Sequence, residues 1–458
     1  MDPTPFSKVA AWVQGRHIAG SGDTTITDVC TDSRALKRGD LFLALRGERF
    51  DGHDFLGEAA RLGAAGAIVE RFPAGLPGSF GLIEVADTLG ALQALASAYR
   101  ATLPLKSVCI TGSNGKTSTK DLTAAVLEKR FSVTCTQGNL NNHIGLPLTI
   151  LRADSRHRAG VFELGMNHAG EIAPLAAIAK PDIGIITNIG VAHIEFLGSR
   201  EAIAQEKGML AEAVGKDGTV ILNADDEFTP SIAARTRAKI MTAGLRSGDV
   251  RATDLEQLSR GIRFRLHATG RCVGAELPVP GEHMVRNALL ACAAGIVLGL
   301  TIEECADGLR DLRLTAGRVT QKGIAGIQIL DDTYNANPDS MSAALVTLAR
   351  LPVAGRRIAV LGRMGELGTE SENGHRRVGE VAGREGIQCL ITVGDEARWI
   401  AESAEAAGVP TVIRAGDFEE AVCALREFAR PGDAVLVKGS RSAKLERVVQ
   451  AMEKGALA

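Results

Sequence analysis

The stretch ITGSNGKTST, residues 110–119, contains the residue types that bind phosphate groups. Its glycines allow backbone N–H groups to face an anion, Lys116 adds a full positive charge, and the Thr117 hydroxyl can bind Mg²⁺. The loop is shorter than the usual phosphate loop, because Ile110 stands where an earlier glycine is expected. An apolar run before it and the helical run STKDLTAAVLEKRF after it favour a nucleotide site over an ordinary strand-to-helix turn. The residues expected around the phosphates are Thr111, Gly112, Ser113, Asn114, Gly115, Lys116, Thr117 and Ser118.

Two further side chains could bind the metal ion that a nucleotide site needs. Glu163 ends the apolar run AGVF, and burying a carboxylate there is costly unless it binds a cation or accepts hydrogen bonds. His193 follows the apolar run IGIITNIGVA, so it should reach the same edge of a parallel sheet. A glutamate capped at a turn and a histidine in the core or a loop are the alternatives.

Lys207 lies on the apolar face of a predicted helix. In SREAIAQEKGMLAEAV it comes four residues after Ile203 and three before Leu210. A buried ammonium must find a partner, lose its proton or be modified. Lys207 is therefore a candidate functional residue, and a lysine that extends its charge to solvent is the alternative.

The elements that position these residues follow an alternating pattern. From residue 105 onward, short Val- and Ile-rich runs alternate with amphipathic Ala- and Leu-rich runs, which predicts parallel sheets flanked by helices. Residues 261–281 alternate with period two and predict a β excursion, followed by two helices that end near Leu312. A second series of apolar runs after residue 325 consists of IQILD, RRIAVLG, QCLITVG, TVIRAG and DAVLVKG.

The expected fold is α/β with three domains, since 458 residues exceed what one core usually serves. The predicted domains are an N-terminal mixed α/β domain (1–103), a central P-loop domain with a parallel sheet (104–313) and a C-terminal Rossmann-like α/β domain (314–458). The stretch LTAGR, residues 314–318, is the predicted hinge.

Composition excludes several classes of function. The net charge is −2 and no basic run is present, which argues against a nucleic-acid partner. The eight cysteines form no C-x-x-C pair, which favours reduced thiols and a cytoplasmic location. The N-terminus lacks the pattern of a secretory signal. The most apolar stretch, 287–300, is shorter than the roughly 20 residues that span a bilayer, and it predicts a buried helix. The sequence shows no heptad seam of the kind that joins chains in a coiled coil, so we expect a monomer.

The motifs together resemble a known family. TGSNGKTST, NLNNHIGLPLTIL, ELGMNHAGEI, TNIGVAHIEFLGS and HMVRNALLACAAG are similar to the Mur ligases, ATP-dependent enzymes that build the peptide stem of peptidoglycan precursors. The resemblance spans the whole chain. Three stretches, TDSRALKRGDLFLALRGERFDGHDF, DDTYNANPDSM and LGRMGELGTES, resemble the member that joins D-alanyl-D-alanine to UDP-N-acetylmuramoyl-tripeptide through an acyl phosphate.

The resemblance implies substrate contacts at the two ends of the chain. The first domain would hold the UDP-muramoyl substrate, and the third would bring the incoming dipeptide. The residues expected near the UDP-linked substrate are Asp32, Ser33, Arg34, Gly47, Asp51, Gly52, Asn139 and Asn142, and those near the dipeptide are Asn335, Asn337 and Pro338, with Lys438 and Ser440 as weaker candidates. Without the resemblance, residues 32–34 read as a capped turn.

The resemblance also assigns roles around the nucleotide. Thr117 and Glu163 would bind one Mg²⁺ and His193 a second, and Lys207 would be carbamylated to give a carboxylate-like metal partner. Lys116, His193 and Lys207 are the expected catalytic residues. Many family members carry Glu two residues after this lysine, whereas this chain has Met209. Asn287 would contact adenine, with a helix-surface asparagine as the alternative, and Arg318 and Asp332 would reach the nucleotide when the domains close.

Three other functions are compatible with parts of the pattern. A Mur-type ligase that adds one amino acid, or a folylpolyglutamate synthase, would share the phosphate loop but is less consistent with DDTYNANPDSM. A nucleotide-binding switch without ligation activity could use the loop, Glu163 and His193, because fold alone does not fix function. Such a switch would leave Lys207 unexplained.

Overall fold

The first domain is a mixed α/β unit in the computed structural model, which describes residues 1–456 of the chain. Its elements are β1 (Thr4–Pro5), α1 (Phe6–Trp12), β2 (Arg16–Ala19), β3 (Thr25–Ile26), β4 (Val29–Cys30), β5 (Leu41–Leu43), α2 (Leu56–Leu62), β6 (Gly66–Val69), β7 (Gly81–Glu84) and α3 (Thr88–Arg100). A five-stranded sheet has the order β2-β7-β6-β5-β4, and β1 pairs with β3. Strands β4 to β7 are parallel, whereas β2 is antiparallel to β7.

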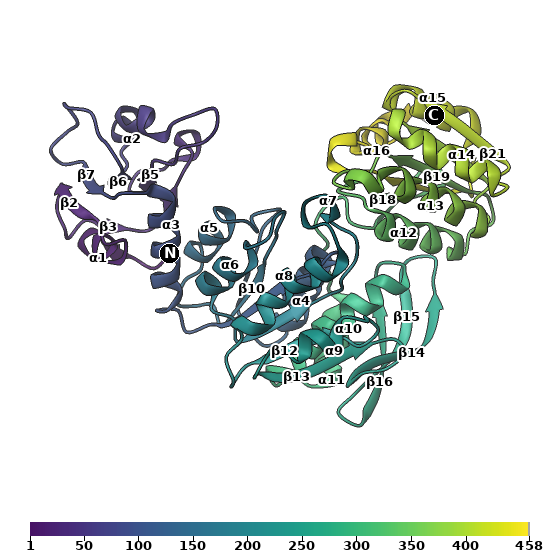
Figure 1. The fold of residues 1–458 in the computed structure, drawn as a ribbon, viewed down its shortest axis with the longest axis horizontal. Helices are drawn as coiled ribbons and strands as arrows, with labels where there is room; N and C mark the ends of the chain where they lie inside the picture. Colours follow the sequence, from purple (N-terminus) through teal and green to yellow (C-terminus); the bar gives the residue numbers. More distant parts are fainter. Residues whose placement is uncertain (457–458) are drawn as a thin grey trace.

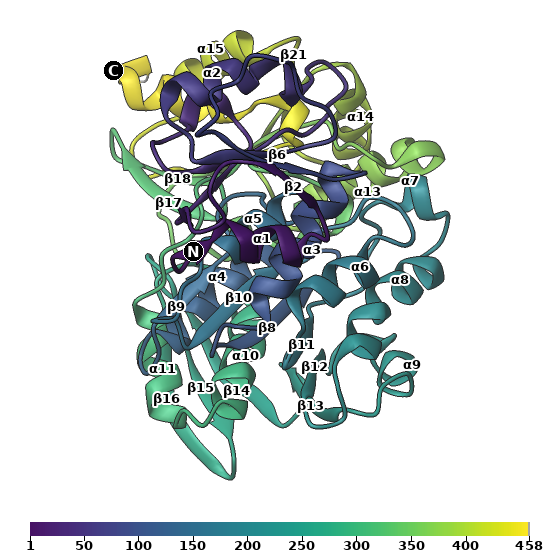
Figure 2. The same ribbon diagram turned by 90° about the vertical axis from the view of Figure 1, so that its left-hand side faces the viewer.

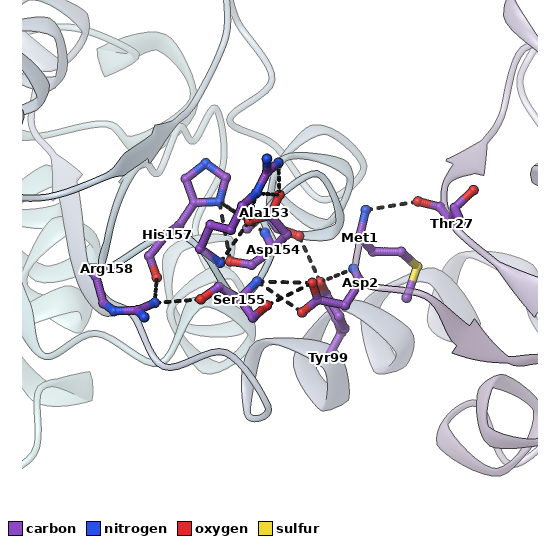
Figure 3. Close-up of polar contacts among 10 residues, drawn as sticks. Met1, Asp2, Thr27, Tyr99, Ala153, Asp154, Ser155, His157 and Arg158 are labelled. Atoms are coloured by element: carbon purple, nitrogen blue, oxygen red, sulfur yellow. Dashed lines mark hydrogen bonds and ion pairs between the residues drawn. The ribbon is translucent and has the colours of Figure 1, made fainter.

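The junction between the first two domains is built on α3 and the N-terminus (Figure 3). The hydroxyl of Tyr99, near the end of α3, accepts from the N–H of Asp2 at 2.7 Å and donates to the Ala153 carbonyl at 2.8 Å. The Asp2 carboxylate accepts from the N–H of Ser155 at 3.0 Å. One apolar core runs from α1 and α3 into the second domain, so the first domain is attached by packing and not only by its linker.

The second domain contains a nine-stranded sheet. Its elements are β8 (Lys106–Thr111), α4 (Lys116–Leu127), β9 (Val133–Cys135), α5 (Gly145–Leu151), β10 (Ala159–Glu163), α6 (Ile172–Ala179), β11 (Ile183–Ile186), α7 (Ile194–Leu197), α8 (Arg200–Ala213), β12 (Thr219–Asn223), α9 (Thr229–Ala233), β13 (Lys239–Gly244), β14 (Val250–Gln257), β15 (Ile262–Ala268), β16 (Arg271–Leu277), α10 (Glu282–Val297) and α11 (Ile302–Arg310). The strand order is β16-β15-β14-β13-β12-β11-β8-β10-β9. The predicted β excursion is confirmed as the antiparallel hairpin of β15 and β16, and the two helices after it are α10 and α11.

Strand β8 shows why the parallel strands read as continuous apolar runs. Its side chains alternate between two cores, with Val108 and Ile110 on the side of α4 and α10, and Cys109 on the side of α5, α6 and α8. Helices cover both faces of the sheet, so every position of β8 after Lys106 is buried. The apolar stretch at 287–300 is confirmed as a buried helix, because α10 packs against α4 and the sheet.

The third domain repeats the alternation around a six-stranded sheet. Its elements are β17 (Thr320–Ile324), β18 (Ile327–Asp332), α12 (Pro338–Arg350), β19 (Arg357–Gly362), α13 (Ser371–Arg384), β20 (Cys389–Val393), α14 (Arg398–Ala406), β21 (Thr411–Ala415), α15 (Phe418–Phe428), β22 (Ala434–Lys438) and α16 (Glu446–Ala451). The strand order is β17-β18-β22-β19-β20-β21, and all five predicted strands are confirmed. Edge strand β17, antiparallel to β18, was not predicted, because TQKGI is largely half-exposed and not an apolar run.

The first and third domains lie on either side of the second (Figure 1). The predicted hinge at 314–318 connects α11 to β17 without regular structure. Short helix α7 rises from the second domain beside the third, and Figure 2 shows it near α13. Within residues 1–456, no helix is both long and apolar enough to cross a membrane. All eight cysteines are free.

Candidate active site

The phosphate loop connects β8 to α4, as the sequence predicts. Gly112 and Gly115 have φ values of 147° and 79°, which favour glycine. A Cβ at Gly112 would lie 1.8 Å from the Thr187 hydroxyl oxygen, and one at Gly115 would lie 2.5 Å from Oδ1 of Asn287. The two glycines therefore allow both a left-handed turn and close packing, which an anion-binding loop requires.

The loop is also held from the strand beside it. The N–H of Ser113 donates to the Asn188 carbonyl at 2.9 Å, and the N–H of Asn114 donates to the Asn188 side chain at 3.0 Å. The Thr187 hydroxyl donates to the Asn114 carbonyl at 2.6 Å. Asn188 was not among the predicted site residues, although a polar side chain inside the apolar run IGIITNIGVA was a usable signal.

Lys116 folds back over the loop. Its Nζ donates to the Gly112 carbonyl at 2.7 Å. Burial lowers the pKa of Lys116, whereas the charge of Glu163 acts in the opposite direction. The Lys116 ammonium therefore lies against the loop.

Glu163 ends β10 as predicted and is nearly fully buried. Its Oε1 accepts from Nδ2 of Asn141 at 2.8 Å, and its backbone N–H donates to the Thr136 hydroxyl at 2.9 Å. Its Oε2 is buried and has no hydrogen-bond partner in the part of the chain that the structure describes. A buried carboxylate oxygen without a donor is favourable only if it binds a cation or another donor.

His193 lies at the start of α7 with a left-handed backbone, φ 65°. Its Nδ1 is 2.6 Å from a carboxylate oxygen of Glu366, which belongs to the third domain. The pair has an ion-pair distance without hydrogen-bond geometry. Burial lowers the pKa of His193, although the Glu366 carboxylate acts in the opposite direction. Glu366 was missed by sequence analysis because 173 residues separate the two positions.

Lys207 lies in α8 and is fully buried, as its spacing predicts. Among residues 1–456, its Nζ has no hydrogen-bond partner. Burial lowers the pKa of Lys207 well below its usual value, and the charge of Lys116 acts in the same direction. The alternative of a lysine that extends to solvent is therefore wrong. Met209, two residues on, accepts at its sulfur from Arg235 and does not replace a carboxylate.

The third domain contacts the phosphate loop directly. Arg318 donates to the Thr117 hydroxyl at 3.3 Å and stacks 4.0 Å from the centre of the Tyr334 ring. Nδ2 of Asn337, the N-cap of α12, donates to Oδ1 of Asn114 at 2.7 Å. These contacts bring residues of DDTYNANPDSM onto the loop.

A cavity of about 1060 Å³ lies between the second and third domains. Asp332, on its wall, accepts from the buried Nζ of Lys438 at 2.5 Å, and the same Nζ donates to the Asn335 carbonyl at 2.9 Å. The predicted residues that line the cavity are Ser113, Asn114, Gly115, Lys116, Thr117, Ser118, His193, Asn287, Arg318, Asp332, Asn335, Asn337, Lys438 and Ser440. Asn287 is buried against Gly115, so the alternative of a helix-surface asparagine is wrong.

The predicted residues of the first domain lie away from this cavity. Asp32 caps the short turn Ser33–Ala35 by accepting from the N–H of Arg34, and the Arg34 guanidinium pairs with the same carboxylate at 2.7 Å. Asp51 caps the next turn and pairs with His53 and Arg71.

Two glycines of this domain shape a neighbouring loop. Gly47 donates its N–H to the Phe50 carbonyl. A Cβ at Gly52 would lie 2.8 Å from the Leu45 backbone. Both positions therefore set the path of the chain between β5 and α2.

Of the three asparagines in NLNNHIG, only Asn141 contacts Glu163. Asn139 is exposed, and Asn142, also exposed, accepts from the N–H groups of Ile144 and Gly145 at the start of α5. The motif was recognised from the sequence, but which asparagine faces the carboxylate depends on the path of the loop.

The site fits a nucleotide phosphate with a divalent cation. Thr117 lines the cavity, whereas Glu163 and Lys207 do not. Each of these two side chains has a buried polar atom without a hydrogen-bond partner among residues 1–456, and each interacts electrostatically with Lys116, which does line the cavity. Residues 1–456 contain no group of three or more His, Cys, Asp or Glu side chains that could hold a metal by itself. A cation would therefore share protein ligands with phosphate oxygens, as Mg²⁺ does in nucleotide sites.

A phosphate loop at a sheet edge, facing a cavity closed by a second α/β domain, defines a nucleotide-dependent enzyme that brings two substrates together between domains. Three family descriptions match the chain: the Mur ligase family catalytic domain over residues 25–100, the Mur ligase middle domain over 110–295 and the Mur ligase glutamate ligase domain over 317–441. The chain belongs to the Mur ligase family.

Relatives match the chain over nearly its full length. It is 39% identical to the UDP-N-acetylmuramoyl-tripeptide–D-alanyl-D-alanine ligase of Bacillus subtilis, with 93% of each chain covered, and 38% identical to that of Escherichia coli, with 94% of each covered. A crystal structure of MurF from Acinetobacter baumannii superposes with a TM-score of 0.90 at 33% identity over 99% of each chain. A complex of MurF from Thermotoga maritima with ADP gives 0.85 at 29% identity, covering 94% of this chain and 97% of that one.

Proposed function

We propose that this enzyme joins D-alanyl-D-alanine to UDP-N-acetylmuramoyl-tripeptide, with hydrolysis of ATP to ADP and phosphate, and so forms the pentapeptide precursor of peptidoglycan. The observation that supports the proposal most directly is the hydrogen bond from Asn337, in the stretch DDTYNANPDSM, to Asn114 of the phosphate loop. The names of the relatives at 36–40% identity point to the same reaction. The alternatives fit less well, because folylpolyglutamate synthase and the diaminopimelate-adding ligase resemble the chain with TM-scores of only 0.63 and 0.56.

The chemistry explains why a phosphate loop must face a second substrate domain. Joining a carboxylate and an amine in water is uphill, so the carboxylate is first phosphorylated. The dipeptide amine then attacks the acyl phosphate carbonyl, and phosphate leaves as the amide forms. An acyl phosphate hydrolyses in water, so docking of the third domain protects it.

The loop residues act by position and charge. Lys116 and the loop N–H groups would bind the ATP phosphates and neutralise charge on the phosphoryl group that moves. Thr117 and Glu163 would hold one Mg²⁺, and His193 a second. Bound Mg²⁺ supplies further charge neutralisation and orients the phosphate oxygens.

Lys207 is proposed to be carbamylated. Its neutral amine would add CO₂, forming an N–C bond and releasing a proton, which leaves a carboxylate on the buried side chain. The full burial of Nζ without a partner supports this modification. Such a carboxylate would serve the cation held by His193.

The remaining predicted residues divide between the nucleotide and the two substrates. Asn287 is proposed to contact adenine, because it packs on Gly115 and lines the cavity. Arg318 and Asp332 would contact the bound nucleotide, and Asn335 and Asn337 the dipeptide. The residues of the first and second domains that we propose to lie near the UDP-linked substrate are Asp32, Ser33, Arg34, Gly47, Asp51, Gly52, Asn139 and Asn142.

The domain roles follow the same division. Residues 1–103 would bind the UDP-linked substrate, 104–313 the ATP, and 314–458 the dipeptide. We also propose that the enzyme acts as a monomer in the cytoplasm, where ATP is available.

Phosphate release from ATP and Mg²⁺ tests the proposal. Purified protein should release phosphate only when UDP-N-acetylmuramoyl-tripeptide and D-alanyl-D-alanine are both present, and mass spectrometry should detect the pentapeptide product. Release that does not depend on either substrate would instead identify a nucleotide switch. Release driven by a single amino acid would identify a different Mur ligase.

A further inference from the structure

The contact between His193 and Glu366 joins two strained backbones from different domains. Both residues are non-glycine and left-handed, with φ values of 65° and 60°. Such conformations persist only where the surroundings enforce them, and they concentrate at functional sites. Their side chains meet at 2.6 Å on the wall of the cavity.

The Glu366 loop is anchored in the third domain and also contacts α7 of the second. The Glu366 loop is anchored by buried Met364, whose N–H donates to Nε2 of His375 in α13 at 3.0 Å, and by buried Leu367. The Glu366 carbonyl accepts from the N–H of Glu195 in α7 at 3.4 Å. The carboxylate therefore reaches His193 only while α7 and this loop are docked.

The two nitrogens of the His193 ring have different surroundings. Nδ1 faces the Glu366 carboxylate, so Nε2 is the nitrogen left for a cation. A carboxylate on the second nitrogen of a ligating histidine fixes the tautomer and orientation of the ring, and its loss typically weakens metal binding 10- to 100-fold.

We propose that Glu366 is a positioning residue that fixes the His193 imidazole for the second divalent cation, so that docking of the third domain completes this cation site. The inference rests on the proposed function for the identity of that cation site. It adds that the domain that carries the incoming amine also prepares the metal site for phosphoryl transfer. Phosphorylation of the first substrate would then be efficient only when the third domain is in place.

Binding of Mn²⁺ to the protein–ADP complex, counted by electron paramagnetic resonance, tests the proposal without turnover. Wild type should bind two Mn²⁺ ions. Glu366→Gln should weaken the second by about tenfold and leave the first unchanged. Glu370→Gln, an exposed carboxylate one turn further along, is the matched control and should match wild type. A Glu366→Gln variant that binds both ions like wild type would overturn the proposal.

A double-mutant cycle separates positioning from an independent role. If Glu366 acts through His193, Glu366→Gln should change Mn²⁺ binding less than twofold in a His193→Ala background. Additive losses would show that Glu366 binds the cation or docks the domain by itself, and would overturn the proposal.

Steady-state kinetics give a second readout. In Glu366→Gln the Mg²⁺ concentration for half-maximal rate should rise about tenfold, while the KM for D-alanyl-D-alanine stays within twofold. A raised dipeptide KM with unchanged Mg²⁺ dependence would count against positioning. If no ligation occurs even in wild type, the proposed function fails, whereas the Mn²⁺ count still decides the role of Glu366.

Discussion

The carboxylate of Asp121 accepts a hydrogen bond of 2.8 Å from the backbone N–H of Thr315, which lies 194 residues further along the chain. Asp121 is in α4, one turn beyond Lys116 and Thr117, and Thr315 is in the segment that leads to the third domain. Three residues later, Arg318 reaches the Thr117 hydroxyl. The helix that follows the phosphate loop is thus hydrogen-bonded to the predicted hinge, residues 314–318.

We expect Asp121→Asn to loosen this hinge. A hydrogen bond to a charged group typically contributes about 1.5–3 kcal/mol, and the amide retains only part of it. Hydrogen exchange over residues 314–324 should accelerate, and the ligation rate should fall several-fold while ADP affinity changes little. Asp311→Asn, an exposed carboxylate paired with Lys129, should change none of these quantities. Equal exchange in both variants would contradict the hinge role.

Asn141 should matter more than the two asparagines beside it. Within residues 1–456, Asn141 is the only side chain that donates to the Glu163 carboxylate, so Asn141→Ala leaves both carboxylate oxygens without a donor from these residues. The carboxylate would then be poorly oriented, so we expect the half-saturating Mg²⁺ concentration for ligation to rise about tenfold. Asn139→Ala is the control, because Asn139 is exposed and does not contact Glu163. A larger rise in the half-saturating Mg²⁺ concentration in Asn139→Ala than in Asn141→Ala would show that Glu163 does not hold the cation.

Lys207 provides a test of carbamylation. Lys207→Ala should reduce ligation by about 100-fold, with partial recovery in a small carboxylate such as acetate, because the carbamate supplies a metal partner. Wild type in ¹³C-bicarbonate should show a carbamate carbon signal by NMR that the variant lacks. Lys216→Ala, at an exposed lysine after α8, should keep both the signal and the activity. Full activity in Lys207→Ala would refute the role.

His283, on the cavity wall, predicts a pH dependence of stability. Burial lowers the pKa of His283 to about 4, whereas an unfolded histidine titrates near its usual value of about 6.5. Below that value the unfolded chain binds a proton that the folded chain does not yet bind, so the free energy of unfolding falls as pH falls from 6.5 toward 4.

From this histidine we expect the free energy of unfolding measured at α10 to fall by about 2 kcal/mol between pH 7.5 and pH 5. Amide protection factors of residues 282–297, corrected for intrinsic exchange rates, should record it. His283→Gln should reduce this loss, whereas substitution of exposed His143 by Gln should not. An unchanged pH dependence in His283→Gln would show that other groups titrate.

The sequence by itself determined the parts of the protein that depend on local pattern. The phosphate loop could be predicted because glycines, Lys116 and Thr117 stand in consecutive order between an apolar strand and a helix. Lys207 could be singled out because helical spacing fixes which face a residue shares. The order of strands and helices from residue 105 onward followed from alternating apolar runs, apart from β9, β13, β14 and the edge strand β17.

Only the tertiary structure decided which polar groups meet. Asn141 faces Glu163 and its neighbours do not, because the path of the loop before α5 turns one side chain inward. Glu366 meets His193 and Thr315 meets Asp121 because the third domain folds back onto the second. Such pairs leave no periodic trace in the sequence, since each depends on a single contact between distant segments. Local order therefore specifies the elements, whereas the partners of the buried charges depend on how the domains pack.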